Sequence, residues 1–511
     1  MEGQRGKLKA LVWLAIAGLC IFGVSRLDRA VCFSGDSLSK LVQAESLRKS
    51  GFSSEELFYP GRAIDSEYRF YPFPGVYHLI IHGRHLGQYP IAFAAATGLL
   101  LKAISPGGLF ILGAALYLLL MYLFDRFAQP SPLLLLFVAA GTPILTFSVD
   151  YSEHIYFALI NFGGLILFLS GLRLENSRRL FLGGMLIGFG LYLRLESLIF
   201  FSALFGGVCL ELILSRRLTF KSLQPPGLFA GGFLVAAGSF FLFNALHYGH
   251  PLGPRFMANE EAFAIPLASR LGQIITLLFA RGFQLGFFGY MPIFLFVLGA
   301  TLLPAFRSRL DFANRSMALA MIFYLPVVAV ASPGDGVVNW GPRFLLLAIL
   351  PCALLLVSLS RFTWPAIVRA GAVLLCVVSI AFTFMGMRLQ KNACRQLSQY
   401  QNDFVNAQAD IWIFSSQLLS NYMGPEFFAR ETYLAQDAES ARELAKKLRS
   451  SSKKPLRVAY FESVVPEEWK KALAEQNLVD RPEVGAELKK DLRATGEVKG
   501  RFTLATIFEI P

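Results

Sequence analysis

Long runs of apolar residues recur along the first 386 residues of this chain, and they restrict its fold more than any other feature. A helix needs roughly 17–25 apolar residues to cross about 30 Å of hydrocarbon. Only 16% of the 511 residues are charged and the mean hydropathy is +0.51, whereas about a quarter of the residues in a soluble domain are charged. We therefore predict an all-α polytopic membrane domain of about 11 transmembrane helices, at 8–25, 108–125, 131–148, 154–172, 179–193, 196–214, 227–246, 283–303, 316–332, 343–360 and 365–386.

The C-terminal tail, residues 387–511, has the composition of a soluble domain. It carries 19 Lys and Arg against 17 Asp and Glu, so it contributes only +2 to the net charge of +13. Its apolar patterns predict three strands and two amphipathic helices, at 410–415, 456–461, 502–510, 438–448 and 466–476. We therefore predict a transmembrane domain at 1–386 and a small α/β domain at 387–511.

Most of the positive charge lies beside the apolar runs, where it predicts orientation rather than nucleic-acid binding. With the runs threaded in order, the short loops on one side hold 15 Lys and Arg, and those on the other side hold five. Short cytoplasmic loops are the Lys- and Arg-rich ones. The N-terminus is therefore predicted to be cytoplasmic, and the long first loop 26–107 and the tail 387–511 to lie outside the cytoplasm of a multi-pass plasma-membrane protein.

The apolar run 88–104 is ambiguous, because counting it as a crossing would reverse the charge bias of every later loop. We therefore predict an interfacial or re-entrant helix there, on the outside. The one Asn-x-Ser/Thr sequon, at Asn314, then falls on the cytoplasmic side, which favours a bacterial inner membrane. Cys32 and Cys394 lie clearly outside the apolar runs, but the six cysteines show neither zinc-ligand spacing nor a disulfide framework.

An acidic residue follows the first apolar run, in the string Phe33-Ser34-Gly35-Asp36-Ser37-Leu38-Ser39-Lys40. Asp36 suits two roles equally well on sequence chemistry alone. It can cap the helix that runs to about Ser50, or it can act as a general base at the membrane surface.

A second acidic cluster, Asp150-Tyr151-Ser152-Glu153-His154, stands between two predicted spans. Asp150 and Glu153 have the spacing of a capping box, which is a structural role. Glu153 and His154, however, would enter the apolar slab, where ionisable groups are costly and usually mark a functional site.

Two further strings place arginines at the predicted outer ends of spans. Arg194 and Glu196 occupy a very tight turn, where Arg194 either closes the turn by snorkelling or holds a lipid phosphate. Trp340 and Arg343 precede the span 343–360 as interfacial anchors, or Arg343 clamps a phosphate at a helix start. His247 and His250, between these strings, lack a nearby carboxylate, so they predict a metal only weakly.

Taken together, these features resemble the GT-C class of integral-membrane glycosyltransferases, which includes the protein O-mannosyltransferases and the aminoarabinose transferases. The resemblance covers roughly residues 8–386 and is carried by four motifs in their order: Asp36, the Ser-x-x-Tyr-Ser-Glu-His string ending at His154, the Arg194-x-Glu196 turn and Trp340-Gly-Pro-Arg-Phe-Leu. Two features depart from the class: the segment 71–74 reads Tyr-Pro-Phe-Pro instead of carrying Pro-Pro, and no second acid pairs with Asp36.

The resemblance implies sugar transfer, with inversion, from a polyprenyl-phosphate donor to a hydroxyl of a glycan, lipid or protein outside the cytoplasm. It implies Asp36 as the general base, since a phosphate leaving group needs charge stabilisation more than protonation. Arg343, Arg194 and Lys40 would then bind the donor phosphate. The acceptor or sugar would be shaped by Asp150, Glu153, His154, Glu196 and Trp340. No cofactor is firmly implied, and the need for a divalent metal stays open.

Three other functional classes stay open on the sequence. A transporter or lipid flippase would share the many spans, although it should show inverted repeats or polar residues at mid-bilayer. An O-antigen-ligase-like envelope enzyme would use external Arg and His without an aspartate base, and a non-catalytic scaffold would use the tail as a binding module.

Overall fold

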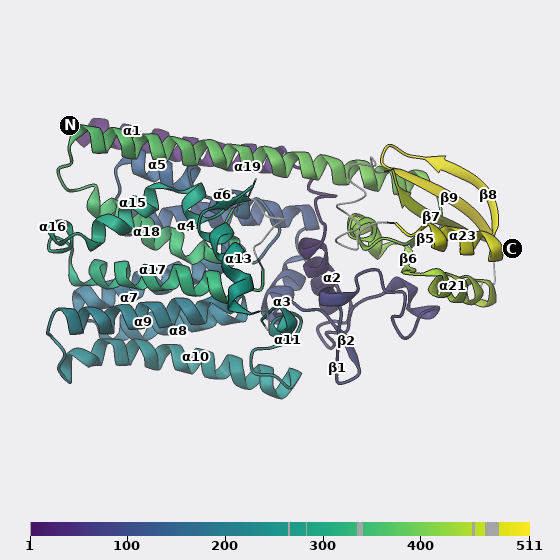
Figure 1. The fold of residues 1–511 in the computed structure, drawn as a ribbon, viewed down its shortest axis with the longest axis horizontal. Helices are drawn as coiled ribbons and strands as arrows, with labels where there is room; N and C mark the ends of the chain where they lie inside the picture. The colour runs from purple at the N-terminus through teal and green to yellow at the C-terminus, as the bar shows by residue number, and fades with distance from the viewer. Residues whose placement is uncertain are drawn as a thin grey trace. The chain divides into compact units, whose positions relative to one another are not determined.

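The computed structural model describes residues 2–263, 266–282, 284–334, 341–451, 455–464 and 480–510. These residues form two compact units (Figure 1). Unit 1 contains Met1–Arg26, Pro90–Phe93 and Gly108–Gln390. Unit 2 contains Leu27–Tyr89, Ala94–Gly107 and Lys391–Pro511, so most of the first loop belongs with the tail.

Unit 1 is a helical bundle of strongly apolar segments. Within the described ranges, seven helices are long and apolar enough to cross a membrane by length and composition, which confirms the prediction of a polytopic helical protein. They are α1 (Glu2–Ser25), α4 (Pro106–Ala128), α7 (His154–Leu174), α9 (Glu196–Leu214), α10 (Gln224–Tyr248), α17 (Phe312–Ala331) and α19 (Ala366–Asn406). The total of 11 crossings stays a prediction.

Two predicted spans are not continuous helices. The run 131–148 divides into α5 (Pro132–Ala140) and α6 (Ile144–Ser148), with Gly141 as the C-cap of the first and Pro143 as the N-cap of the second. The described part of 283–303 contains β4 (Gln284–Leu285), α14 (Phe287–Tyr290) and α15 (Ile293–Leu302). Glycine and proline interrupt both runs, because Pro lacks the N–H that a helix interior needs and Gly favours turns.

The helix α3 (Ile91–Leu100) lies in the ambiguous run 88–104. Its 10 residues rise by only about 15 Å, about half the hydrocarbon thickness. This length excludes a full crossing by α3 alone, and the interfacial or re-entrant placement stays a prediction.

The helices that carry the predicted site residues pack closely. Figure 1 shows α7, α8 (Ser177–Phe189), α9 and α10 running side by side in unit 1. A methyl group on Gly184 of α8 would collide with the carbonyl oxygen of Phe229, and one on Gly232 of α10 with that of Phe181. These glycines let the α8 and α10 backbones touch, as small residues do between membrane helices.

The tail in unit 2 forms a five-stranded sheet in the order β6-β5-β7-β9-β8. Strand β5 pairs in parallel with both β6 and the central strand β7, while β9 is antiparallel to β7 and β8. The strands are β5 (Ile411–Phe414), β6 (Glu431–Leu434), β7 (Leu456–Ser463), β8 (Arg493–Lys499) and β9 (Thr503–Ile510), with helices α20 (Gln417–Ser420), α21 (Ala438–Ser451) and α23 (Pro482–Asp491). The predicted α/β tail is confirmed, and the predicted helix 466–476 lies outside the described residues.

The remaining elements of the described residues are shorter. In unit 2 they are α2 (Asp36–Lys49), η1 (Pro60–Ala63), η2 (Gly75–Tyr77), η7 (Gly424–Phe428) and the hairpin β1 (Leu79–Ile81) and β2 (Arg84–Leu86). In unit 1 they are η3 (Gly190–Tyr192), η4 (Lys221–Leu223), α11 (Pro254–Met257), α12 (Glu260–Phe263), η5 (Leu267–Arg270), α13 (Leu271–Leu278), β3 (Ala280–Arg281), α16 (Pro304–Arg307), η6 (Arg343–Leu345) and α18 (Leu346–Leu359).

Candidate functional site

Unit 1 gathers five charged or polar side chains into one buried group, which we call the acid–arginine cluster: Glu153, His154, Arg194, Glu196 and Arg255. Each stands at or beside a helix start. Glu153 is the N-cap of α7 and His154 its first residue, Glu196 begins α9, and Arg255 lies in α11. The cluster therefore joins three helix ends that are far apart in sequence.

Arg194 is the centre of this cluster. Its Nη1 donates to Glu153 Oε1 at 3.0 Å, while Nη2 and Nε donate to Glu196 Oε1 at 2.5 and 3.1 Å. The side chains of Arg194 and Glu153 are each only 2% exposed. Because a buried charge is costly unless it is paired and hydrogen-bonded, the two carboxylates make the buried guanidinium tenable.

His154 extends the cluster with a defined protonation pattern. Its Nε2 lies 3.1 Å from Arg194 Nη1, and its Nδ1 lies 2.6 Å from Ser152 Oγ. Arginine only donates hydrogen bonds, so we assign Nε2 as the acceptor and place the imidazole hydrogen on Nδ1, facing Ser152. The ring also stacks on Phe147, with centroids 5.0 Å apart.

The capping-box interpretation of Asp150 and Glu153 is wrong. A capping box needs the acid at N3 and its partner at the N-cap, but Glu153 is itself the N-cap of α7 and makes no side-chain cap bond. Its carboxylate is directed to Arg194 instead, because an unpaired arginine there would be too costly. Asp150 is half-buried just before this helix.

Arg255 is a cluster member to which the sequence analysis assigned no role. Its Nη1 lies 3.5 Å from Glu153 Oε1, and its side chain also lines a shallow hollow at the surface of unit 1. The rest of the lining is mostly apolar: Pro90, Ile91, Ala92, Leu191, Tyr192, Leu195, Phe240, Phe243, Asn244, Leu252 and Pro254. A cation thus stands at the edge of an apolar hollow.

One sequence signal could have identified Arg255. The tetrapeptide Gly-Pro-Arg-Phe occurs twice, at 253–256 and at 341–344. Both glycines have positive φ, 76° at Gly253 and 102° at Gly341, a conformation that glycine adopts without strain. Each copy turns the chain sharply before a short helix and presents an arginine there.

Arg343 lies in η6 and approaches the acid–arginine cluster through an aromatic ring. The Arg343 Cζ atom is 5.0 Å from the centroid of Phe344, and the Arg194 Cζ atom is 5.6 Å from the same centroid. The structure therefore brings together two of the three cations predicted to bind phosphate. Trp340 lies outside the described residues.

Asp36 and Lys40 belong to unit 2. Gly35 is the N-cap of α2, with no side-chain cap bond, and Asp36 is the first helical residue, so the N-cap interpretation of Asp36 is wrong. The hydroxyl of Tyr77 donates to Asp36 Oδ1 at 3.2 Å. Lys40 follows one turn later, buried, with Nζ 4.8 Å from the Tyr89 ring centroid. Convergence of Asp36 with the arginines of unit 1 stays a prediction.

Metal-ligating groups are sparse in the described part of the chain. No set of three or more His, Cys, Asp or Glu side chains there is arranged to hold a metal ion. His250 Nδ1 accepts a hydrogen bond from the Leu252 N–H at 3.1 Å, and the His250 ring stacks on the Phe256 ring. The His247 ring stacks on the Phe243 ring. These two histidines thus have local structural partners.

Comparison with known proteins identifies the fold. No protein-family model matches the sequence, and no curated protein matches it. Among solved structures, ArnT from Cupriavidus metallidurans bound to undecaprenyl phosphate aligns over 98% of this chain and 97% of its own, with a TM-score of 0.53 and 13% identity. The apo form of the same protein aligns over the same shares, with a TM-score of 0.55 and 14% identity. ArnT is an aminoarabinose transferase of the GT-C class, so the predicted GT-C-like fold is confirmed.

Proposed function

We propose that this protein is a membrane glycosyltransferase that moves a sugar from a polyprenyl-phosphate donor to an acceptor hydroxyl. The observation that carries the proposal is the fold shared with ArnT over nearly the whole length of both chains. One of those ArnT structures is bound to undecaprenyl phosphate, which supports a lipid-phosphate substrate for this chain as well.

The apolar residues around Arg255 support a donor that carries an apolar chain beside its phosphate. The walls of the hollow are aliphatic and aromatic, and its charged edge is a guanidinium, which binds phosphate oxygens well. Arg343 supplies a second guanidinium, whose Cζ lies 5.0 Å from the centroid of the Phe344 ring that Arg194 also approaches. Arg194 already faces two carboxylates, so its part is to hold Glu153 and Glu196 and to add positive potential behind the phosphate. Lys40 is proposed as a further cation.

The chemistry we assign is a displacement with inversion at the anomeric carbon. Asp36 takes the proton of the acceptor hydroxyl, which attacks as the phosphate leaves through an oxocarbenium-like transition state. The arginines stabilise the charge that gathers on the phosphate. The sugar or the acceptor is positioned by Asp150, Glu153, His154, Glu196 and Trp340. The displacement as written needs no metal ion, and we leave a requirement for a divalent ion open.

The disulfide between Cys32 and Cys394 supports the proposed sidedness. Disulfides persist in oxidising compartments and are rare in the cytosol. Both cysteines belong to unit 2, together with Asp36. We therefore place unit 2 on the extracytoplasmic face of a bacterial inner membrane, with the N-terminus in the cytoplasm and a glycan, lipid or protein as acceptor.

The test is transfer by Asp36→Asn in membranes supplied with labelled polyprenyl-phosphate sugars. Loss of a general base should lower the rate by about 10²–10⁴-fold, while binding of the labelled donor should persist. Asp437→Asn, an exposed aspartate of the tail, is the matched control and should transfer at the wild-type rate. Normal transfer by Asp36→Asn removes Asp36 from the base role. Movement of the donor lipid across the membrane without any sugar transfer by the wild type would instead indicate a flippase.

A further inference from the structure

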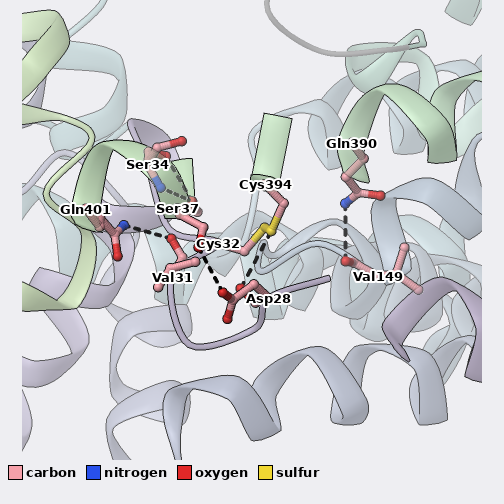
Figure 2. The surroundings of a disulfide bond; sticks show 10 residues. Asp28, Val31, Cys32, Ser34, Ser37, Val149, Gln390, Cys394 and Gln401 are labelled. Carbon is pink, nitrogen blue, oxygen red and sulfur yellow. Dashed lines mark hydrogen bonds between the residues drawn. A yellow bond between two sulfur atoms is a disulfide. The ribbon is translucent and has the colours of Figure 1, made fainter. Parts of the chain in front are cut away.

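The tail of unit 2 holds the chain on both sides of Asp36. On the first side, Cys32 is joined by a disulfide to Cys394 in the last part of α19, with Cα atoms 5.2 Å apart (Figure 2). Cys32 stands four residues before Asp36 and is separated from Cys394 by 362 residues. The bond therefore ties the segment leading into α2 to the tail covalently.

Two hydrogen bonds from α19 reinforce this attachment. Gln401 Nε2 donates to the Val31 carbonyl at 3.0 Å (Figure 2). Ser398 Oγ donates to Asp28 Oδ2 at 3.1 Å. Cys394, Ser398 and Gln401 follow one another at four and three residues, so they lie on one face of the helix. This face of α19 fits against the short segment 28–32.

On the second side, the tail holds the segment that reaches Asp36 through Tyr77. Ser420 Oγ of α20 donates to the Pro72 carbonyl at 2.6 Å, and Gln417 Nε2 donates to the Pro74 carbonyl at 3.2 Å. The Leu434 N–H, at the end of β6, donates to the Phe70 carbonyl at 2.8 Å. Three residues beyond Pro74, Tyr77 donates its hydroxyl to Asp36.

The segment 70–74 also covers the edge of the sheet at which ligands usually bind. In open sheets with parallel strands, ligands bind outside the carboxyl ends of the strands. Here α20 directly follows β5, and Leu434 ends β6, so the first loop occupies that edge itself. The sheet is thus built onto the loop that carries Asp36.

We propose that the tail is a positioning clamp for Asp36, with Cys32–Cys394 as its covalent attachment and the 417–420 helix as its second contact. The catalytic consequence rests on the proposed function. Misplacing a reacting group by about 1 Å can cost on the order of 100-fold in rate. Without the clamp the carboxylate still titrates and the donor still binds, but the base no longer meets the acceptor hydroxyl.

The experiment compares Cys32→Ser, Cys394→Ser and the double variant with the wild type in detergent or membranes. All three should lower kcat on the order of 100-fold and by the same factor, because either single change removes the whole disulfide. The KM for the polyprenyl-phosphate donor should rise far less than kcat falls, because Arg255 and Arg343 of unit 1 are untouched and only Lys40, of the proposed phosphate-binding residues, lies in the loosened segment. Amide hydrogen exchange in residues 28–40 should become faster, while exchange in unit 1 stays unchanged.

Matched controls separate positioning from general damage. Cys209→Ser changes a free cysteine of unit 1, and Ser450→Ala changes an exposed tail serine; both should behave as wild type. The pair Ser420→Ala with Gln417→Ala breaks the second contact without touching the disulfide, and it should also speed exchange in residues 33–40. If the cysteine variants do not fold, tris(2-carboxyethyl)phosphine applied to the folded wild type makes the same test.

The two proposals fail differently. Unchanged exchange in residues 28–40, after loss of the disulfide and after loss of the second contact, overturns the clamp. So does a rise in donor KM that accounts for the whole loss of activity. If the wild type transfers no sugar but the exchange pattern changes as expected, the clamp stands and the glycosyltransferase function is overturned.

Discussion

Arg194 and Glu153 form an ion pair with 3.0 Å between Nη1 and Oε1, although 41 residues separate them in the sequence. Glu196 and Arg255 complete the charge balance on either side of the pair. The charge of Arg194 is already neutralised by two carboxylates. Arg255 differs because its side chain also lines the apolar hollow. In the function proposed above, Arg194 and the two glutamates hold the helix starts, and Arg255 is the residue proposed to bind the donor phosphate.

Replacing Arg194 with alanine should destabilise the protein strongly. Removing one partner of a buried ion pair leaves an uncompensated charge and costs about 3–5 kcal/mol. The free energy of unfolding, measured by denaturant titration in detergent, should fall by that amount. The double variant Arg194→Met with Glu153→Gln should recover part of the loss, because it leaves fewer unpaired charges, and equal stability of Arg194→Ala and wild type would contradict the buried pair.

Replacing Arg255 with alanine should weaken donor binding more than folding. A hydrogen bond to a charged group contributes about 1.5–3 kcal/mol, so the donor KM should rise by roughly 10- to 150-fold, while kcat changes less. Arg281→Ala removes an exposed arginine of unit 1 and is the control for general loss of charge. A donor KM unchanged in Arg255→Ala would place the phosphate elsewhere.

The sequence predicted those elements whose signal is local. Long apolar runs predicted α7, α9 and α17, and short apolar runs predicted the strands β5, β7 and β9. Strand β8 was missed because its residues are nearly all exposed at the edge of the sheet, so it has no apolar alternation to read. The predicted continuous helices at 131–148 and 283–303 are interrupted, because glycine and proline lie inside both runs.

The candidate site was predicted in its residues but not in its contacts. Charged residues near span ends were conspicuous, since charge in an apolar slab is costly, and Arg194, Glu153, Glu196 and His154 do meet. The partner of each charge depends on long-range packing, so neither the role of Arg255 nor the pairing of Cys32 with Cys394 could be derived from spacing. Disulfide pairing in particular depends on the distance between Cα atoms, which the sequence does not give.

Acid should destabilise the hairpin of unit 2 through His78. Its Nε2 lies 2.7 Å from His85 Nδ1, and burial, followed by the charge of His85, lowers the pKa of His78 from 6.5 to about 4. Between these values the unfolded chain binds more protons than the folded one, so the free energy of unfolding falls as the pH falls from 6.5 towards 4. Hydrogen exchange of β1 and β2 at pH 7.5 and pH 5 measures this change.

The control for this prediction is the exposed neighbour His82. His78→Gln should remove most of the acid-induced rise in exchange, because the group that resists protonation is gone, whereas His82→Gln should keep it. The same pH dependence in wild type and His78→Gln would assign the effect to other groups.

Unit 1 contains another buried carboxylate in ion pairs, outside the acid–arginine cluster. It allows a test of whether a buried ion pair of this protein can stabilise the fold without affecting sugar transfer. Glu211 of α9 is 1% exposed and pairs with Arg307 and with Arg315, whose Nε lies 2.7 Å from Oε1. These two arginines belong to a loop whose positive charge we interpreted as a signal of orientation. Their pairing with Glu211 shows that they also join α9 to α16 and α17.

Glu211→Gln should therefore destabilise without altering transfer. Both arginines remain partly exposed, at 23% and 20%, so the loss should be near the lower end for a broken buried pair, about 3 kcal/mol. Below its unfolding temperature the variant should keep the kcat and donor KM of the wild type, whereas Arg194→Ala should lose activity under the same conditions. Arg309→Gln, an exposed change in the same loop, should affect neither quantity. The ion pairs of Glu211 are with Arg307 and Arg315, which do not belong to the acid–arginine cluster. A fall in kcat for folded Glu211→Gln would therefore mean that a change at the α9–α17 contact alters the structure of the site.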